Sequence, residues 1–268
     1  MTTRKRTAHN EIQLSEGIMG QITHTQDSGA EFSYPVIRPK PAGTLLILDE
    51  VNRRPHVLMG RRHNAHTFMP DVFVFPGGRV DFPDNYAPFA KDLTPGTAAR
   101  LIASGPRNVA TMKRVRAFAL AAIRETFEEA GILIGQQMDP EKKTDKKTRN
   151  ALWKPFFDHG QIPDLSAMRY VARATTPAKL VRRYDTRFFT VTRDAISLEL
   201  SESPTNELSE LTWVPLDDIS HLKIPWITSM VLKDVAIRVA DINSIYLSDD
   251  QPVPIYASRR GKRSRTLI

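Results

Sequence analysis

The stretch that decides the fold reads Arg124-Glu125-Thr126-Phe127-Glu128-Glu129-Ala130-Gly131-Ile132. At about 100° per residue, a helix over 116–130 gathers three carboxylates within roughly 100° of one face; these are Glu125, Glu128 and Glu129. The opposite face carries an apolar stripe, formed by Leu120, Ile123, Phe127 and Ala130. We therefore predict an amphipathic helix over 116–130 that ends at Gly131, because glycine commonly terminates helices.

The three carboxylates suit a divalent cation. Like charges at these spacings each cost about 0.2–0.5 kcal/mol, and the helix dipole disfavours Glu128 and Glu129 in the last turn. A hard cation such as Mg²⁺, which prefers oxygen ligands, would reverse both penalties. Arg124, four residues before Glu128, can hold that carboxylate with paired hydrogen bonds. The alternatives are a solvated acidic face and an ordinary surface ion pair.

The rest of the chain predicts short strands interleaved with helices. Breaker residues such as Pro76-Gly77-Gly78 predict turns between these elements. We expect strands at 42–48, 57–60, 72–75, 170–174, 188–191 and 211–214, and helices at 97–104, 153–157 and 225–240. This uneven alternation favours an α/β layered domain with a mixed sheet. We expect an N-terminal extension at 1–36, the domain at 37–245, and a basic C-terminal tail at 246–268.

Composition narrows the chemistry. The 268 residues are 41% hydrophobic and 25% charged, with a net charge of +8 and no cysteine. Thiolate metal sites, disulfides and cysteine nucleophiles are therefore excluded. No apolar run approaches the roughly 20 residues of a membrane-spanning helix, so we expect a cytoplasmic protein without a membrane partner. The basic termini would attract polyphosphates or nucleic acid, or they are solvated, disordered tails.

The residues resemble the Nudix box, Gly-x5-Glu-x7-Arg-Glu-U-x-Glu-Glu-x-Gly-U, where U is apolar. The second half matches 124–132 except for Thr126 at an apolar position. Phe75-Pro76-Gly77-Gly78 resembles the usual lead-in, Gly78 takes the place of the first glycine, and Asp84 takes that of the first glutamate. Residues 85–123 stand where the motif has seven positions, so the box carries an insertion at 85–115. The resemblance implies a Nudix-type α/β/α sandwich.

This resemblance also implies a reaction, namely hydrolysis of a diphosphate linkage in a nucleoside diphosphate derivative with Mg²⁺ or Mn²⁺. The implied metal ligands are Glu125, Glu128, Glu129 and the carbonyl of Gly78 or Gly77. The implied catalytic residues are Glu125, Glu129 and Glu207, with Glu210 as another candidate base. Arg124, Gly77 and Gly131 would orient the site, and Asp84 or its rival Asp81 would add a carboxylate. Arg62, Arg183 and Arg187 are candidates for binding substrate phosphates, or they form structural ion pairs.

The split box and residues 176–189 resemble one branch of the family, which includes the peroxisomal coenzyme A diphosphatase of animals. That likeness implies coenzyme A or acyl-CoA as the small-molecule substrate. A second motif of coenzyme A-cleaving relatives is mostly absent, and Thr266-Leu267-Ile268 is not a peroxisomal signal. The alternatives are a nucleotide sugar, a dinucleotide, a dinucleoside polyphosphate or capped RNA, or a non-catalytic module that binds a nucleotide.

Overall fold

A computed structural model describes residues 37–63, 71–105, 111–139, 150–178, 182–259 and 262–268. The predicted extension at 1–36 lies outside these residues. The strands are β1 Lys40–Val51, β2 Arg54–Arg62, β3 Phe73–Val74, β4 Gly77–Arg79, β5 Ile132–Gln137, β6 Gln161–Pro163, β7 Arg169–Thr175, β8 Tyr184–Thr192, β9 Ile196–Glu199, β10 Leu208–Pro215, β11 Pro254–Arg259 and β12 Lys262–Leu267. The helices are α1 Pro95–Ser104, α2 Met112–Ala130, α3 Lys154–Asp158 and α4 Trp226–Ile242.

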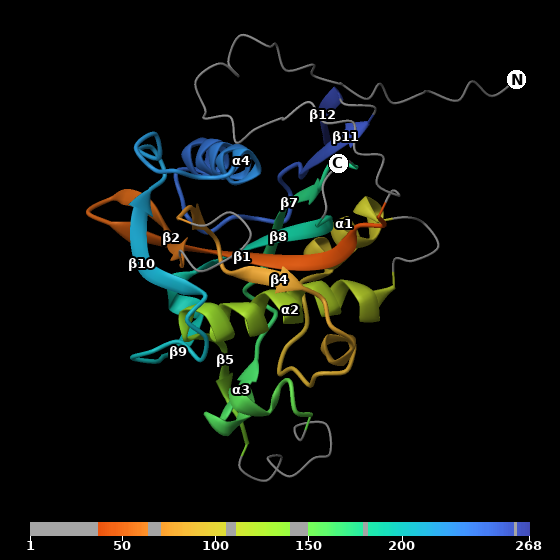
Figure 1. Cartoon of the computed structure of the whole chain (residues 1–268), viewed down its shortest axis with the longest axis vertical. Helices are drawn as coiled ribbons and strands as arrows, with labels where there is room; N and C mark the ends of the chain where they lie inside the picture. Colours follow the sequence, from red (N-terminus) through yellow and green to blue (C-terminus); the bar gives the residue numbers. More distant parts are fainter. Residues whose placement is uncertain (1–36, 64–70, 106–110, 140–149, 179–181, 260–261) are drawn as a thin grey trace, which may run out of the picture.

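A nine-stranded mixed sheet forms the middle of the molecule. Its order is β10-β2-β1-β8-β7-β11-β12, with β3 paired to β2 and β4 paired to β1. The pairs β1–β8 and β7–β11 are parallel, whereas the other pairs are antiparallel. A smaller sheet, β6-β5-β9, lies with α3 beyond α2 (Figure 1). The predicted mixed sheet is therefore confirmed.

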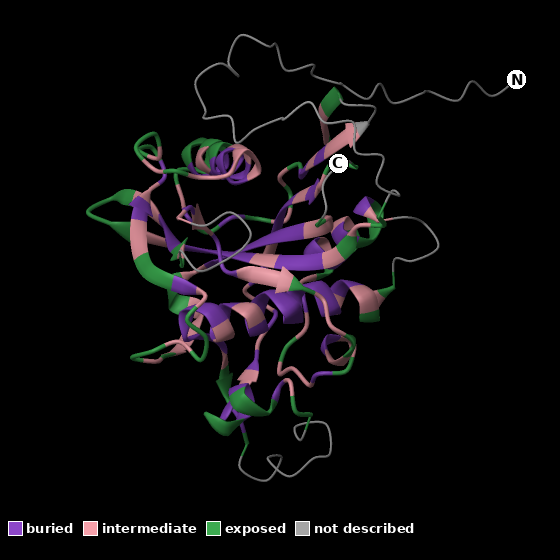
Figure 2. Cartoon of the chain, in the orientation of Figure 1, coloured by how far each residue is buried: buried purple, intermediate pink, exposed green. Residues whose placement is uncertain are grey.

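Helices cover both faces of the large sheet (Figure 1). Side chains alternate between the faces of a strand, so β1 contributes residues to two hydrophobic cores. Leu45 and Ile47 join the core beneath α1 and α2, whereas Leu46 and Leu48 join the core beneath α4. Figure 2 shows that β1 consists largely of buried residues and that α2 and α4 also contain buried residues. The result is an α/β/α sandwich in which β1, an interior strand of the sheet, contributes side chains to both cores.

Helix α1 belongs to the long segment between β4 and α2. Thr94 begins it by accepting a hydrogen bond from the Thr97 backbone N–H, and Ala98 and Leu101 are buried in the core beneath α2. The predicted helix at 97–104 is thus present. The turn predicted at Pro76-Gly77-Gly78 is wrong in part, because Gly77 and Gly78 pair with β1 as strand β4.

The C-terminal segment is part of the sheet, although a separate basic tail was expected at 246–268. β11 pairs with β7, and β12 pairs with β11. Val253 and Tyr256 are buried, and Arg265 binds Asp234 of α4 through two hydrogen bonds. Apolar burial and charge pairing therefore hold this basic segment in place. In the described part of the chain, no helix is long and apolar enough to span a membrane.

Candidate active site

Helix α2 carries the predicted carboxylates and lies directly against β1. Thr111 caps its first turn by accepting a hydrogen bond from the Arg114 backbone N–H. A Cβ atom at Gly43 of β1 would lie only 2.1 Å from the Phe118 backbone oxygen, so the helix approaches as closely as a glycine permits. The helix ends at Gly131, which has a left-handed φ of 69° and donates its N–H to the Phe127 carbonyl. The predicted stop is confirmed.

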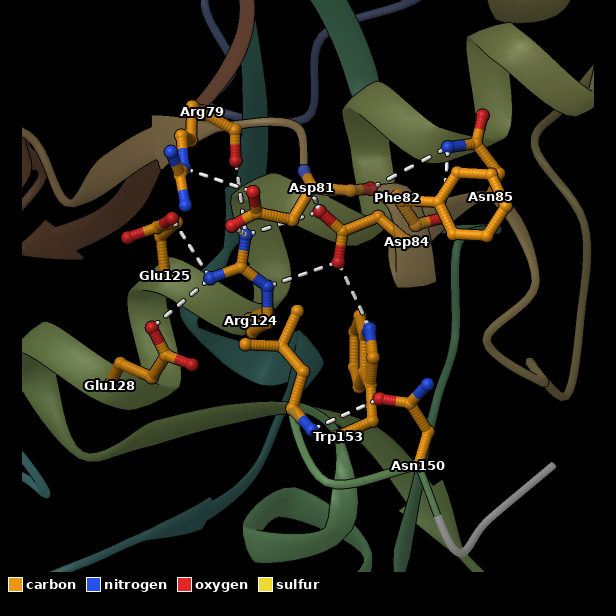
Figure 3. Close-up of polar contacts among 11 residues, drawn as sticks. Arg79, Asp81, Phe82, Asp84, Asn85, Arg124, Glu125, Glu128, Asn150 and Trp153 are labelled. Atoms are coloured by element: carbon orange, nitrogen blue, oxygen red, sulfur yellow. Dashed lines mark hydrogen bonds and ion pairs between the residues drawn. The ribbon is translucent and has the colours of Figure 1, made fainter. Parts of the chain in front are cut away.

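Arg124 connects Asp84 to the glutamates of α2, and its side chain is 2% exposed. Its Nε and Nη2 donate to the two carboxylate oxygens of Asp84 at 3.0 and 3.1 Å. Its Nη1 donates to Glu125 at 2.8 Å and to Glu128 at 3.1 Å. Figure 3 shows these carboxylates arranged around one guanidinium. Arg124 therefore contacts two of the three carboxylates, and its orienting role stays a prediction.

Asp84, rather than Asp81, is the main carboxylate partner of Arg124. The Asp84 side chain is fully buried, whereas an Asp81 oxygen lies 3.9 Å from the Arg124 Nη2. The Asp81 backbone N–H donates to Asp84 at 2.8 Å. Both Asp84 oxygens thus accept hydrogen bonds, which leaves this residue as an anchor for Arg124 instead of a metal ligand.

The sequence interpretation missed Trp153, which also binds Asp84. Its indole Nε1–H donates to the Asp84 Oδ1 at 3.0 Å, and the Trp153 side chain is buried. Figure 3 shows the indole N–H and the Arg124 Nε both pointing to this Asp84 oxygen. The two residues are 69 positions apart in the sequence, and no motif marks a tryptophan as a partner of the acidic helix.

Glu129 connects α2 to strand β4. Its Oε2 accepts a hydrogen bond from the Gly77 backbone N–H at 2.9 Å, and the residue is 3% exposed. Burial raises the pKa of Glu129 well above its ordinary value, and the negative charge of Glu207 adds to this effect despite the Gly77 hydrogen bond. Gly77 thus contacts a carboxylate whose charged form is disfavoured, and its orienting role stays a prediction.

Glu125 packs against the second glycine of the lead-in. A Cβ atom at Gly78 would lie 2.3 Å from the Glu125 carboxyl carbon, so a larger residue there would displace the Glu125 side chain. Burial raises the pKa of Glu125 to about 7, although the charge of Arg124 opposes the shift. Burial raises the pKa of Glu128 as well. The three carboxylates of this face therefore all carry a penalty in their charged form.

Glu207 and Glu210 differ in their surroundings. Arg62 donates to the Glu207 carboxylate at 3.0 Å, and Glu207 is near enough to affect the pKa of Glu129. Glu210 instead pairs with Arg61 at 3.3 Å on the exposed side of β10. Thr205 donates its backbone N–H and its hydroxyl to the Glu128 carbonyl at 2.9 and 2.8 Å. This attachment holds the loop before β10 at the end of α2 and places Glu207 nearer the site.

Arg183 and Arg187 occupy structural positions, so their predicted role in phosphate binding finds no support. Arg187 is 4% exposed, pairs with Asp185 at 2.7 Å and lies 4.1 Å from the Phe118 ring centroid. Phe118 precedes Glu128 by ten residues, or about 15 Å of helix. Arg183 donates to the backbone oxygens of Thr176 and Ile37. Both guanidiniums hold the start of β8 instead of facing the carboxylates.

The donor set has the chemistry of a site for a hard divalent cation. Three carboxylates share one helix face, and cations of this class favour oxygen ligands. Within the described ranges, no three acidic or histidine side chains already converge as a ligand cluster, because Glu125 and Glu128 point to Arg124 and Glu129 points to Gly77. A cation would favour the charged forms that burial disfavours, so the residues fit such an ion.

A polar cleft opens beside Glu129. Its volume is about 490 Å³, and it lies between the end of α2, the loop before β10, and β10 itself. Its lining includes His63, Ser203, Asn206 and Leu208. Glu129 is therefore one of the residues that line this cleft.

Comparisons with known proteins agree with this architecture. No protein-family model and no curated protein matches the chain. A NUDIX hydrolase structure from Alicyclobacillus acidocaldarius is 24% identical with a TM-score of 0.53, covering 74% of this chain and 91% of that chain. The NUDIX domain of Shewanella oneidensis NrtR, solved with ADP ribose, is 10% identical with a TM-score of 0.41, covering 76% and 90%. The first likeness shows that the chain has the Nudix fold.

Proposed function

We propose that this chain hydrolyses a diphosphate linkage in a nucleoside diphosphate derivative and uses Mg²⁺ or Mn²⁺. The observation that carries the proposal is the set of three carboxylates at the end of α2, two of them held by Arg124 and one by Gly77. A purely structural acidic face would be solvated, whereas Glu129 is buried. The Nudix fold supports the same reaction class.

Glu125, Glu128 and Glu129 would hold the cation together with the carbonyl of Gly78. The bound cation supplies charge neutralisation for the diphosphate and acidifies the attacking water. Phosphoryl transfer depends mainly on positioning and charge stabilisation, so the chain needs few other groups. Arg124 keeps Glu125 and Glu128 in place, and Gly77 does the same for Glu129.

Glu207 is our candidate general base. It lies outside the helix that carries the cation ligands, is 32% exposed, and is oriented by Arg62. It would take a proton from water as the water oxygen bonds to phosphorus, while the bridging oxygen leaves with the other phosphate. Glu129 and Glu125 are the alternative bases. Any of the three must lie within hydrogen-bond reach of the attacking water.

Within this class, we propose coenzyme A or acyl-CoA as the substrate. The support is the likeness of the split box and of residues 176–189 to the coenzyme A diphosphatase branch. The long segment between β4 and α2 folds in part as α1 against the core, which agrees with a box that tolerates extra residues.

A substrate panel tests both levels of the proposal. Coenzyme A, NADH, ADP-ribose, diadenosine polyphosphates and capped RNA are incubated with Mg²⁺ or Mn²⁺, with a chelator as the control, and products are identified by mass spectrometry. We expect cation-dependent cleavage of a diphosphate, with coenzyme A turned over fastest. If coenzyme A stays intact while another member is cleaved, only the substrate assignment fails. Binding without cleavage of any member would favour the non-catalytic module.

A further inference from the structure

Asp84 is a buried carboxylate whose charge is satisfied from three directions. Its oxygens accept from two nitrogens of Arg124, from the Asp81 backbone N–H, and from the Trp153 indole. A buried charge is costly unless hydrogen bonds satisfy it. Trp153 therefore contributes to holding the Asp84 side chain in place, and Figure 3 shows the contact between them.

Trp153 is itself rigidly held. Its ring packs on Phe156 and Phe157, with centroid distances of 5.5 and 5.8 Å. Its backbone N–H donates to the Asn150 carbonyl at 3.1 Å. The indole N–H is a donor only, so it can serve Asp84 in one way, as a fixed hydrogen-bond donor.

We propose that Trp153 is a positioning residue for the cation-binding carboxylates and acts on them through Asp84 and Arg124. This inference rests on the proposed function for the role of Glu125 and Glu128. The Asp84 carboxylate fixes one edge of the Arg124 guanidinium, and the Arg124 Nη1 fixes both glutamates. Partners outside the ligand set typically change metal affinity by about 10–100-fold. Trp153 belongs to the segment before α3, so a region outside the motif controls the site.

The test compares Trp153→Phe with Phe156→Leu. The first change removes the indole N–H but keeps an aromatic ring, whereas the second disturbs the same aromatic cluster and leaves the donor in place. Mn²⁺ affinity is measured without substrate by electron paramagnetic resonance, and unfolding is measured beside it. We expect Trp153→Phe to weaken Mn²⁺ binding about 10-fold and to lower kcat more than it changes KM. Phe156→Leu should lower the unfolding temperature with Mn²⁺ affinity unchanged.

Equal losses of Mn²⁺ affinity in both variants, or no loss in Trp153→Phe, would overturn the inference. A measurement on the unaltered protein covers the case in which Trp153→Phe does not fold. The chain has three tryptophans, so ¹⁵N-indole labelling gives three N–H signals, assigned with Trp213→Phe and Trp226→Phe. Saturating Mg²⁺ should shift the Trp153 signal and leave that of Trp226 in place; an unmoved Trp153 signal also overturns the inference. If Mn²⁺ affinity responds as expected but no diphosphate is cleaved, only the hydrolase proposal fails.

Discussion

The end of α2 and the start of β8 both bury charged side chains, but the ratio of carboxylates to arginines is reversed between them. At the start of β8, Asp185 is shared by Arg187 of the same strand and Arg173 of the neighbouring β7. Burial alone would raise the pKa of Asp185, yet the hydrogen bonds and charges of the two arginines outweigh it and lower that pKa. At α2, one guanidinium serves Asp84, Glu125 and Glu128, and the pKa values of Glu125 and Glu128 rise.

This difference separates the ion pairs at β8 from the proposed cation site at α2. Where positively charged side chains outnumber carboxylates, as at β8, the buried carboxylate keeps its charge without a metal ion. Where carboxylates are in excess, burial and mutual repulsion penalise the charged forms, and a bound cation would remove the penalty. The end of α2 differs from the start of β8 in its excess of negative charge, more than in the presence of glutamates.

The largest expected effect is on turnover. Glu128→Gln and Glu129→Gln each remove one proposed cation ligand with little change in shape, so each should lower kcat by orders of magnitude while the protein stays folded. Steady-state kinetics on the substrate that the panel identifies would measure this. Glu199→Gln is the matched control, because Glu199 is an exposed member of a long ion pair with Arg193. Cation-dependent turnover that persists in both variants would remove the catalytic role of α2.

The second effect concerns pH and the cation together. The pKa of Glu125 rises from 4.5 to about 7 in the folded chain. A raised pKa means that the folded state binds the Glu125 proton more tightly than the unfolded state does. The stability that this proton contributes is complete below pH 4.5 and is lost as the pH rises toward about 7. In chelator, the free energy of unfolding from urea titrations should therefore fall over this window. Added Mg²⁺ should offset the fall; a stability that rises from pH 4.5 to 7 in chelator would contradict this.

The smallest effect on activity is expected at β8. Asp185→Asn removes the charge that Arg173 and Arg187 share, so the free energy of unfolding at neutral pH should fall by about 1–3 kcal/mol. Because the folded-state pKa of Asp185 is lowered, this contribution is present above its unfolded value of 3.8 and is lost as the pH falls through the folded value. The variant should therefore lose less stability than the parent on acidification, with kcat unchanged. A large drop in kcat of the folded variant would restore Arg187 as a substrate contact.

The sequence by itself determined the acidic helix. Helical periodicity is local, so the two faces of α2 and its stop at Gly131 follow from residues within a few turns of one another. The valines of α4 at 231, 235 and 239 were recognisable for the same reason and are buried. The apolar run Ile132-Leu133-Ile134, which begins β5, carried a local signal that the prediction did not use.

Only the tertiary structure decided which groups meet around that helix. Asp84 reaches Arg124 across 40 positions, and Trp153 reaches Asp84 across 69. The pairing of β11 with β7 and the burial of Arg187 are likewise contacts between distant segments. Such contacts depend on how strands pair and how layers stack, and no spacing within one element encodes them. Periodicity placed the carboxylates on one face, and packing decided which of them are held, buried and left in excess.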